Sequence, residues 1–244
     1  MSDNLWTVAT NIAVTLTAVL STTILLHRSD THGALVLHPV VDWLFRCALW
    51  LTTGIYRPNW IALHRKHHKF TDMELDPHSP LVKGLGHIQW GNLYYYIKGT
   101  QESGLVEKYA PKLRHDAWDK WLFNNGFLGL GLGIFFLIMF LGLWRGLLVS
   151  VVHAFLYVVV ISGSINGICH VWGYKNFRNV PGTNIRLLSW LTGGESLHNN
   201  HHAYPTSPKF SFRRSEFDPS WIVIWVLTHL GLATRSQTIK EQMA

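Results

Sequence analysis

The chain has 244 residues and a formal charge of +7 at pH 7, and 14% of its residues are charged. Soluble domains carry about a quarter charged residues, so this composition excludes an ordinary soluble domain and favours a membrane protein. The basic residues are dispersed without a basic, aromatic-rich tract, which argues against nucleic-acid binding. Two distant cysteines, Cys47 and Cys169, exclude a disulfide framework. The length suits one domain covering residues 1–244.

The first predicted element is a membrane span over residues 5–26, which carries no charged side chain. At about 1.5 Å per residue this segment can cross the hydrocarbon core. The four residues before it contain no basic side chain, so we expect the N-terminus outside. His27 and His32 follow the span and point about 140° apart on an ideal helix. Both can serve one site only if the helix ends or bends between them.

Residues 39–60 carry Asp42, Arg46 and Arg57 among apolar residues, which favours an amphipathic helix in the membrane interface. A full crossing would place His27 and His64 on opposite sides of the membrane. We therefore expect this segment to stay on the cytoplasmic side.

Two histidine triplets have the spacing i, i+3, i+4, which places three imidazoles on one helical face. Each triplet is a candidate metal half-site, so two facing triplets indicate a pair of metal ions. A structural or transport zinc site is the alternative, although zinc usually has four ligands with thiolates common. The triplets are His64, His67, His68 and His198, His201, His202.

The loop after the first triplet contains Asp72 and Asp76, which are candidates to hold the outer ring N–H of ligand histidines. Solvated loop carboxylates are the alternative interpretation. His87 and His115, in the polar segment that follows, are interpreted as ordinary surface or hydrogen-bonded histidines.

Residues 122–144 and 146–168 form two long apolar runs, which predict a hairpin of two further spans. Glycines 126, 129, 131 and 133 permit close helix packing. His153 lies inside this hairpin, where it is either functional or hydrogen-bonded to a neighbouring span. Asn166 and His170 share one helix face at the cytoplasmic end of the hairpin. Residues 220–232 are apolar but too short to cross, so His229 is interpreted as incidental.

These elements predict an all-α integral membrane protein with about three transmembrane helices, interfacial helices and a cytoplasmic histidine-rich cap. The spans are residues 5–26, 122–144 and 146–168, and the cap comprises residues 27–121 and 169–244. Every histidine cluster then lies on the cytoplasmic face. Nine imidazoles without thiolates favour two non-haem iron ions, and redox iron beside a bilayer suggests oxygen chemistry on a lipid chain. The nine are His27, His32, His64, His67, His68, His170, His198, His201 and His202.

Four motifs, HRSDTH, HRKHHKFTDMELDPHSP, NGICHVWGYKNF and GGESLHNNHHAYPTSPKF, resemble those of the membrane fatty acid desaturases, in their bacterial acyl-CoA or acyl-lipid Δ9-type branch. The similarity runs from about residue 23 to 233. The resemblance implies that the nine histidines bind two irons and that Asn166 reaches one iron through water. It also implies O2 as cosubstrate and a long acyl chain carried as a CoA thioester or lipid. Electrons would come from a separate ferredoxin, rubredoxin or cytochrome b5-like donor.

Five polar residues are expected around the ligands: Asp72, Asp76, Glu195, Asn199 and Asn200. The resemblance implies an oxidoreductase of fatty acid biosynthesis in the bacterial cytoplasmic membrane, with its active site facing the cytoplasm. Fatty acyl hydroxylases and acetylenases of the same superfamily use similar histidine motifs and remain an alternative. A membrane metal-transport or bis-histidine haem protein is a non-enzyme alternative. Against it, a carrier needs ligands along a transmembrane path, where this chain offers only His153.

Overall fold

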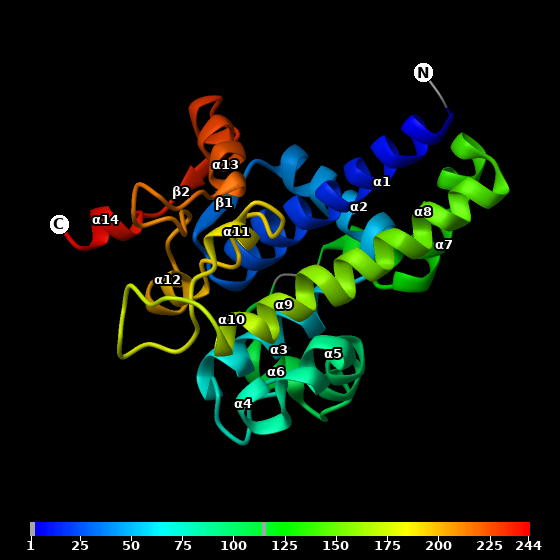
Figure 1. The fold of residues 1–244 in the computed structure, drawn as a ribbon. Helices are drawn as coiled ribbons and strands as arrows, with labels where there is room; N and C mark the ends of the chain where they lie inside the picture. The colour runs from blue at the N-terminus through cyan, green and yellow to red at the C-terminus, as the bar shows by residue number, and fades with distance from the viewer. Residues whose placement is uncertain (1–2, 114–115) are drawn as a thin grey trace.

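The computed structural model describes residues 3–113 and 116–244, so His115 lies outside the described part of the chain (Figure 1). The chain is mostly helical, as predicted. It also contains a small antiparallel sheet, which the all-α prediction omitted. Strand β1, Leu35–Leu37, pairs with β2, Ala233–Arg235, and joins the segment after the first long helix to the C-terminal region.

The first long helix consists of α1, Asp3–Leu20, and the π-helix η1, Ser21–Thr31. Its part from Asn4 to Thr31 is long and apolar enough to cross a membrane, so the helix extends beyond the predicted span. In a π-helix the N–H of residue i+5 donates to the carbonyl of residue i. The N–H of His32 accordingly donates to the carbonyl of His27 at 3.2 Å. In addition, the side-chain hydroxyl of Thr31 donates to the carbonyl of Leu26 at 2.7 Å. The predicted end or bend is thus replaced by π winding, which puts His27 and His32 on the same side.

The predicted amphipathic segment 39–60 is two helices, α2 (Pro39–Thr53) and α3 (Arg57–Phe70). Gly54 ends α2 with a positive φ of 62°, and Pro58 lies in the first turn of α3. The break turns the chain so that α3 carries the first histidine triplet toward the end of η1.

The predicted apolar hairpin is present with different ends. Helix α7 covers Gly126–Leu141, and a continuous helical stretch of 29 residues, Leu143–Val171, follows it. Asn125 caps α7, because its side chain accepts a hydrogen bond from the N–H of Leu128. Gly142, with φ 82°, makes the turn that the sequence placed at Arg145. Two helices, Asn4–Thr31 and Leu143–Val171, are long enough to be candidate spans, whereas α7 is a shorter apolar helix.

The second long stretch is divided into α8 (Leu143–Phe155), the π-helix η3 (Leu156–Ser162), α9 (Gly163–Asn166) and α10 (Ile168–Val171). Glycines on α7 make it pack closely against α2, as their spacing suggested. A Cβ atom on Gly126 or Gly133 would lie 2.1 Å from a backbone oxygen of Gly54 or Leu51.

The remaining helices lie in, or at the edge of, the two segments that were predicted to form the cap. Between α3 and the hairpin lie α4 (Pro80–Lys83), α5 (Leu85–Thr100), α6 (Leu105–Tyr109) and the π-helix η2 (Asp119–Phe123). After α10 come α11 (Arg186–Ser189), α12 (His198–Ala203), α13 (Pro219–His229) and α14 (Ile239–Gln242).

A buried ion pair fixes the end of η1 to the C-terminal region. Arg28 is fully buried and donates to both carboxylate oxygens of Asp218, each at 3.0 Å. Ile24 and Leu25, which precede Arg28 on the same helix, belong to an apolar core that also includes Ile61. Helices α1 and α8 extend together to one end of the molecule, whereas the histidine-bearing helices α3, α10 and α12 lie toward the other end (Figure 1). The arrangement collects the histidines at one end of the long helices.

Candidate metal centre

Nine histidines from four segments meet at the ends of the long helices and form two groups. In each group the available ring nitrogen atoms all lie within 4.8 Å of one another. The five-histidine group consists of His27, His32, His64, His68 and His201. The four-histidine group consists of His67, His170, His198 and His202. The structure therefore brings together all nine histidines that were predicted as ligands.

Each triplet is divided between the two groups, which corrects the expectation that one triplet forms one half-site. On α3, His64 and His68 join the five-histidine group while His67 joins the other. On α12 the pattern is reversed, since only His201 joins the five-histidine group. Positions i and i+4 are about 40° apart on a helix, but i+3 and i+4 are about 100° apart. A triplet therefore supplies two ligands to one side and one to the other.

The nitrogen separations fit ligands of a common metal ion. In the five-histidine group, the Nε2 atom of His201 lies 2.9 Å from that of His68 and 3.1 Å from that of His27. In the four-histidine group, the Nε2 atom of His198 lies 2.9 Å from that of His170 and 3.0 Å from that of His202. Two nitrogens at about 2.0–2.1 Å from one metal, at angles of about 90–110°, are roughly 2.9–3.4 Å apart.

Hydrogen bonding between the rings does not account for these contacts. A neutral imidazole has one N–H donor, so an Nε2 atom that faces two others cannot be satisfied in every contact. In the described part of the chain, the Nε2 atom of His32 is buried without a hydrogen-bond partner. A buried polar atom without a partner is costly, and a metal ion would satisfy it. Both groups therefore fit metal ions held by imidazole.

Three carboxylates contact the outer ring nitrogens of these histidines. The Nδ1 atom of His27 lies 2.6 Å from Glu195, that of His67 lies 3.0 Å from both oxygens of Asp76, and that of His170 lies 3.1 Å from Asp72. An Nδ1–H that donates to a carboxylate fixes the tautomer and leaves the Nε2 lone pair free for a metal. The two loop aspartates are thus not merely solvated, and Asp76 is almost fully buried.

Asn199 and Asn200 contact neighbouring segments of the cap. The side-chain oxygen of Asn199 accepts hydrogen bonds from the backbone N–H groups of Asn176 and Phe177. The Asn200 amide donates to Glu216 at 2.9 Å. Among their described hydrogen bonds, none reaches an imidazole. These asparagines therefore hold α12 against the connection that follows α10.

Asn166 lies one helical turn before His170, and its amide donates to the side-chain oxygen of Asn92 on α5 at 2.8 Å. Asn92 in turn donates to the carbonyl of Val158, at 3.4 Å. The side chain of Asn166 is thereby held by α5, and its described hydrogen bond does not reach a histidine of either group.

His78 is a buried residue of the site that the sequence analysis missed. Its ring stacks on that of His67, with centroids 4.4 Å apart, and its backbone N–H donates to Asp76 at 3.0 Å. His67, Asp76 and His78 form a third group of closely placed ligand atoms. The sequence signal that could have identified His78 was its position two residues after Asp76, inside the second histidine motif.

For seven of the nine histidines, burial favours the neutral form that binds metal, because it lowers the pKa of the ring. Burial is the largest cause, and neighbouring imidazoles add to it. Together they lower the pKa of His68 to about 3. The same causes lower the pKa of His64, His67, His198, His201 and His202 well below the ordinary value. Burial would raise the pKa of Glu195, but nearby His27 and Arg28 outweigh it and lower that pKa.

Histidines outside the groups have other partners. The two ring nitrogens of His153 lie 3.1 Å from the Thr15 hydroxyl and 2.9 Å from the carbonyl of Thr52, which supports the hydrogen-bonded alternative. His87 and His229 are exposed, and each contacts a carbonyl of its own helix or of the preceding turn.

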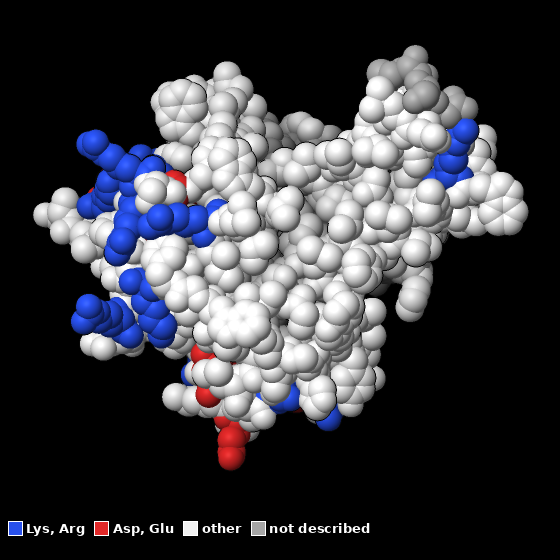
Figure 2. All heavy atoms as spheres, in the orientation of Figure 1, with Lys and Arg blue, Asp and Glu red and all other residues white. Residues whose placement is uncertain are grey.

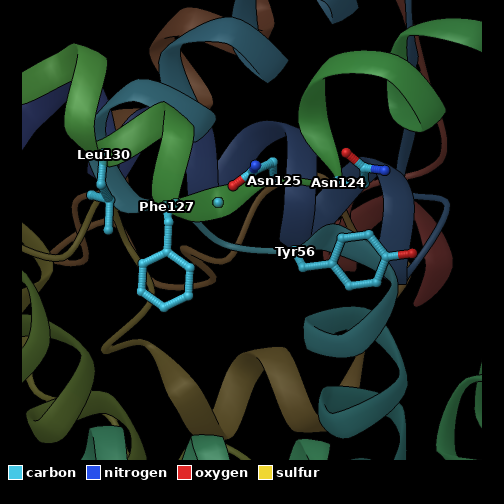
Figure 3. Close-up of a pocket in the computed structure, with 7 residues that line it drawn as sticks. Tyr56, Asn124, Asn125, Phe127 and Leu130 are labelled. Atoms are coloured by element: carbon cyan, nitrogen blue, oxygen red, sulfur yellow. The ribbon is translucent and has the colours of Figure 1, made fainter.

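A cavity of about 540 Å³ lies where α2 ends and α7 begins (Figure 3). Tyr56, Asn125, Phe127 and Leu130 lie around it, together with glycine backbone. Its described lining contains no histidine or carboxylate. The cavity is therefore separate from the ligand set of the two histidine groups.

Comparison with known proteins places these features in a family. A sequence model described as fatty acid desaturase matches residues 4–215. The chain is 31% identical over 227 residues to the Delta-9 desaturase-like 3 protein of Arabidopsis thaliana, covering 88% of this chain and 71% of that protein. It is 33% identical over 228 residues to the acyl-CoA 5-desaturase of Anemone leveillei, covering 88% and 67%. It is 36% identical over 183 residues to the sn-2 palmitoyl-lipid 9-desaturase of Nostoc sp. (strain 36), covering 72% and 62%.

Proposed function

Because the chain belongs to the fatty acid desaturase family and is an oxidoreductase acting on acyl chains, we propose that it is an oxygen-dependent diiron desaturase. It introduces a cis double bond into a long acyl chain carried as a CoA thioester or as a membrane lipid. Relatives named as acyl-CoA and as acyl-lipid desaturases support both carriers.

The two histidine groups carry this proposal. The five-histidine group would hold one iron, and the four-histidine group would hold the second with Asn166 acting through water. A zinc site usually needs four ligands, whereas nine imidazoles in two adjacent groups suit two ions of a metal that imidazole binds well. When bound, iron supplies the oxidising power for unactivated C–H bonds, which side-chain acid–base chemistry lacks.

The protein's own residues position this chemistry. Glu195, Asp76 and Asp72 hold the Nδ1–H groups of three ligand histidines and so orient the rings. Burial keeps the remaining imidazoles neutral, with their lone pairs free. In the overall reaction, two hydrogens of the acyl chain, two electrons, two protons and O2 give the double bond and two waters.

The chain is further proposed to be a single domain and a multi-pass protein of the bacterial cytoplasmic membrane, with the metal site facing the cytoplasm. Two candidate spans and the family's membrane association support a membrane location. The gathering of all nine histidines at one end of the long helices supports a site on one face. A ferredoxin, rubredoxin or cytochrome b5-like protein would supply the electrons.

Lipid mass spectrometry tests the reaction directly. Cells that express the chain are compared with cells that express His201→Ala, which removes one member of the five-histidine group. A desaturase gives acyl species two mass units lighter in the first cells only. Species sixteen units heavier would identify a hydroxylase. Species that lose two further hydrogens would identify an acetylenase. Unchanged lipids together with bound zinc would identify a metal-binding protein.

A further inference from the structure

An exposed basic face surrounds Tyr174. Lys175, Arg186 and Arg213 line a cavity of about 490 Å³ with this tyrosine. The guanidinium carbons of Arg186 and Arg213 lie 4.7 and 5.7 Å from the centre of its ring. We define the basic face by these three cations together with their exposed neighbours Arg178 and Arg214. Lysine and arginine side chains gather densely on one side of the molecule (Figure 2).

The positive charge of this face is not cancelled at the surface. Residues 172–215 contain six lysines and arginines and a single carboxylate, Glu195, which is buried against His27. Among the described residues, no carboxylate forms an ion pair with the five cations of the face. Glu216 lies closest beneath Tyr174, but it is buried and accepts hydrogen bonds from inside the cap. The face therefore presents uncompensated positive charge to an approaching partner.

The basic face is joined to a ligand-bearing helix by buried hydrogen bonds. The hydroxyl of Tyr174 donates to Glu216 at 2.7 Å, and the amide of Asn200 donates to the other oxygen of Glu216 at 2.9 Å. Asn200 precedes His201 on α12. Glu216 and Asn200 therefore connect Tyr174 to α12, the helix that contributes to both histidine groups.

The position of the basic face in the molecule indicates which kind of partner can reach it. The candidate spans reach away from the histidine helices to the far end of the molecule, where α1 begins and α7 meets α8 (Figures 1 and 2). The basic face follows α10 and contacts α12, so it lies at the histidine-bearing end of the molecule. A partner that arrives from the aqueous phase with negative charge fits this position.

The proposed reaction consumes two electrons, which an external donor supplies. We propose that the basic face docks an acidic one-electron carrier protein. Two reduced carriers are oxidised for each double bond formed, and their electrons reach the metal groups by way of α12. The proposal rests on the proposed function and adds the place at which the electron donor binds.

Binding to a plant-type [2Fe–2S] ferredoxin tests the docking surface. The protein is placed in nanodiscs of zwitterionic lipid, and the ferredoxin affinity is measured for wild type, Arg186→Glu and Arg213→Glu. Each reversal is expected to weaken binding about tenfold at roughly 10 mM salt, where the Debye length is about 30 Å. The differences should vanish near about 1 M salt, where charges are screened within about 3 Å.

Lys112→Glu is the matched control, because it makes the same charge change at an exposed lysine outside the face. It is expected to alter ferredoxin affinity less than about twofold. Arg186→Gln serves if the reversals fail to fold, and it should give an intermediate loss. Equal melting temperature and metal content establish that each variant is intact.

Ferredoxin affinity that responds no more to Arg186→Glu than to Lys112→Glu would overturn the proposal. So would binding of coenzyme A or phosphatidylglycerol vesicles that depends on the same arginines while ferredoxin binding does not. Lipid analysis separates this failure from that of the proposed function. A wild type that makes double bonds while the reversals bind ferredoxin normally refutes only the docking surface. Charge-dependent ferredoxin binding by a wild type that makes no product refutes only the desaturase.

Discussion

The five-histidine and four-histidine groups are built from the same two helices in opposite proportions. Helix α3 gives two rings to the first group and one to the second, and α12 does the reverse. Their inequality comes from the third contributor. The π-helix η1 and its C-terminal cap supply His27 and His32, whereas α10 supplies His170 alone. The ligand count of each group is thus set by helix winding at the ends of the two long helices.

The groups also differ in the acids behind them. One carboxylate, Glu195, contacts the five-histidine group, and Arg28 lies 3.6 Å from it. Two carboxylates, Asp72 and Asp76, contact the four-histidine group. The group with fewer imidazoles therefore has more negative charge nearby. This difference predicts that the two groups respond differently when one member is removed.

Removal of one histidine is expected to give the largest effects and to separate the groups. His170→Ala leaves three imidazoles in the four-histidine group, so its metal content should fall from about two irons to about one. His32→Ala leaves four imidazoles in the five-histidine group, which should retain most of its iron. Elemental analysis of purified protein measures both. Product formation should be undetectable in His170→Ala.

Equal iron loss in His170→Ala and His32→Ala would break the comparison, because it would make the groups equivalent in binding. His87→Ala is the control, since this exposed histidine belongs to neither group. Two irons and normal product in His170→Ala would remove His170 from the ligand set.

Substitution of the carboxylates sharpens the comparison at a smaller scale. Glu195→Gln and Asp76→Asn keep the side-chain size but weaken the hold on a ring N–H. Loss of such outer partners typically lowers metal affinity or activity about 10–100-fold. Iron titration with a competing chelator should show weaker binding of one ion in each variant. Asp72 also contacts the four-histidine group, so Asp76→Asn should weaken iron binding less than Glu195→Gln does. A larger loss of iron affinity in Asp76→Asn would contradict an independent role of Asp72.

The triplet spacing indicated that six of the nine histidines share helix faces, but it did not predict how those six divide between the two groups. A triplet at i, i+3, i+4 shows that three rings share a face, but the partner surface decides which ring turns to which group. The pairing of His27 with His32 needed π winding, and helical periodicity assumes an α-helix. Asp72 and Asp76 could be suggested because they follow a histidine triplet. His78 was missed because a single histidine in a loop gives no periodic signal.

In the fold, too, the sequence predicted the long elements better than their ends. Long uncharged runs predicted the first helix and the helix that follows Gly142. The ends of α7 were less predictable. Asn125 caps its first turn, and Gly142 ends it with a positive φ. The sheet between β1 and β2 joins two three-residue strands far apart in sequence, and such short segments carry no usable alternation.

Acid should destabilise the metal-free protein through both groups. Their buried imidazoles have a pKa below the ordinary value of 6.5, so the unfolded chain binds more protons below that pH. Stability is therefore present above about pH 6.5 and falls as the pH drops toward the lowered pKa values. The melting temperature of chelator-treated protein in detergent should be lower at pH 5.5 than at pH 7.5.

Single substitutions apportion this acid sensitivity. His68→Gln and His202→Gln remove one titrating ring from the five-histidine and four-histidine groups, respectively. Each should reduce the drop in melting temperature between the two pH values, whereas the exposed His87→Gln should leave it unchanged. A reduction in only one of the ligand variants would show that the groups are not equally shielded. A melting temperature that rises on acidification would refute the assignment of neutral buried rings.

The smallest effect is expected at His153, which is buried like the ligands but belongs to neither group. Its ring joins α8 to Thr15 on α1 and to the carbonyl of Thr52 on α2, so its contribution is to helix association. Hydrogen bonds between membrane helices contribute about 0.6 kcal/mol on average. His153→Phe should therefore lower the melting temperature slightly and leave iron content and product unchanged. His153→Gln, which can keep one of the two contacts, should lose less stability. If His153→Phe instead removed a metal ion while His153→Gln kept it, the ligand set would extend beyond the two groups and into the helical bundle.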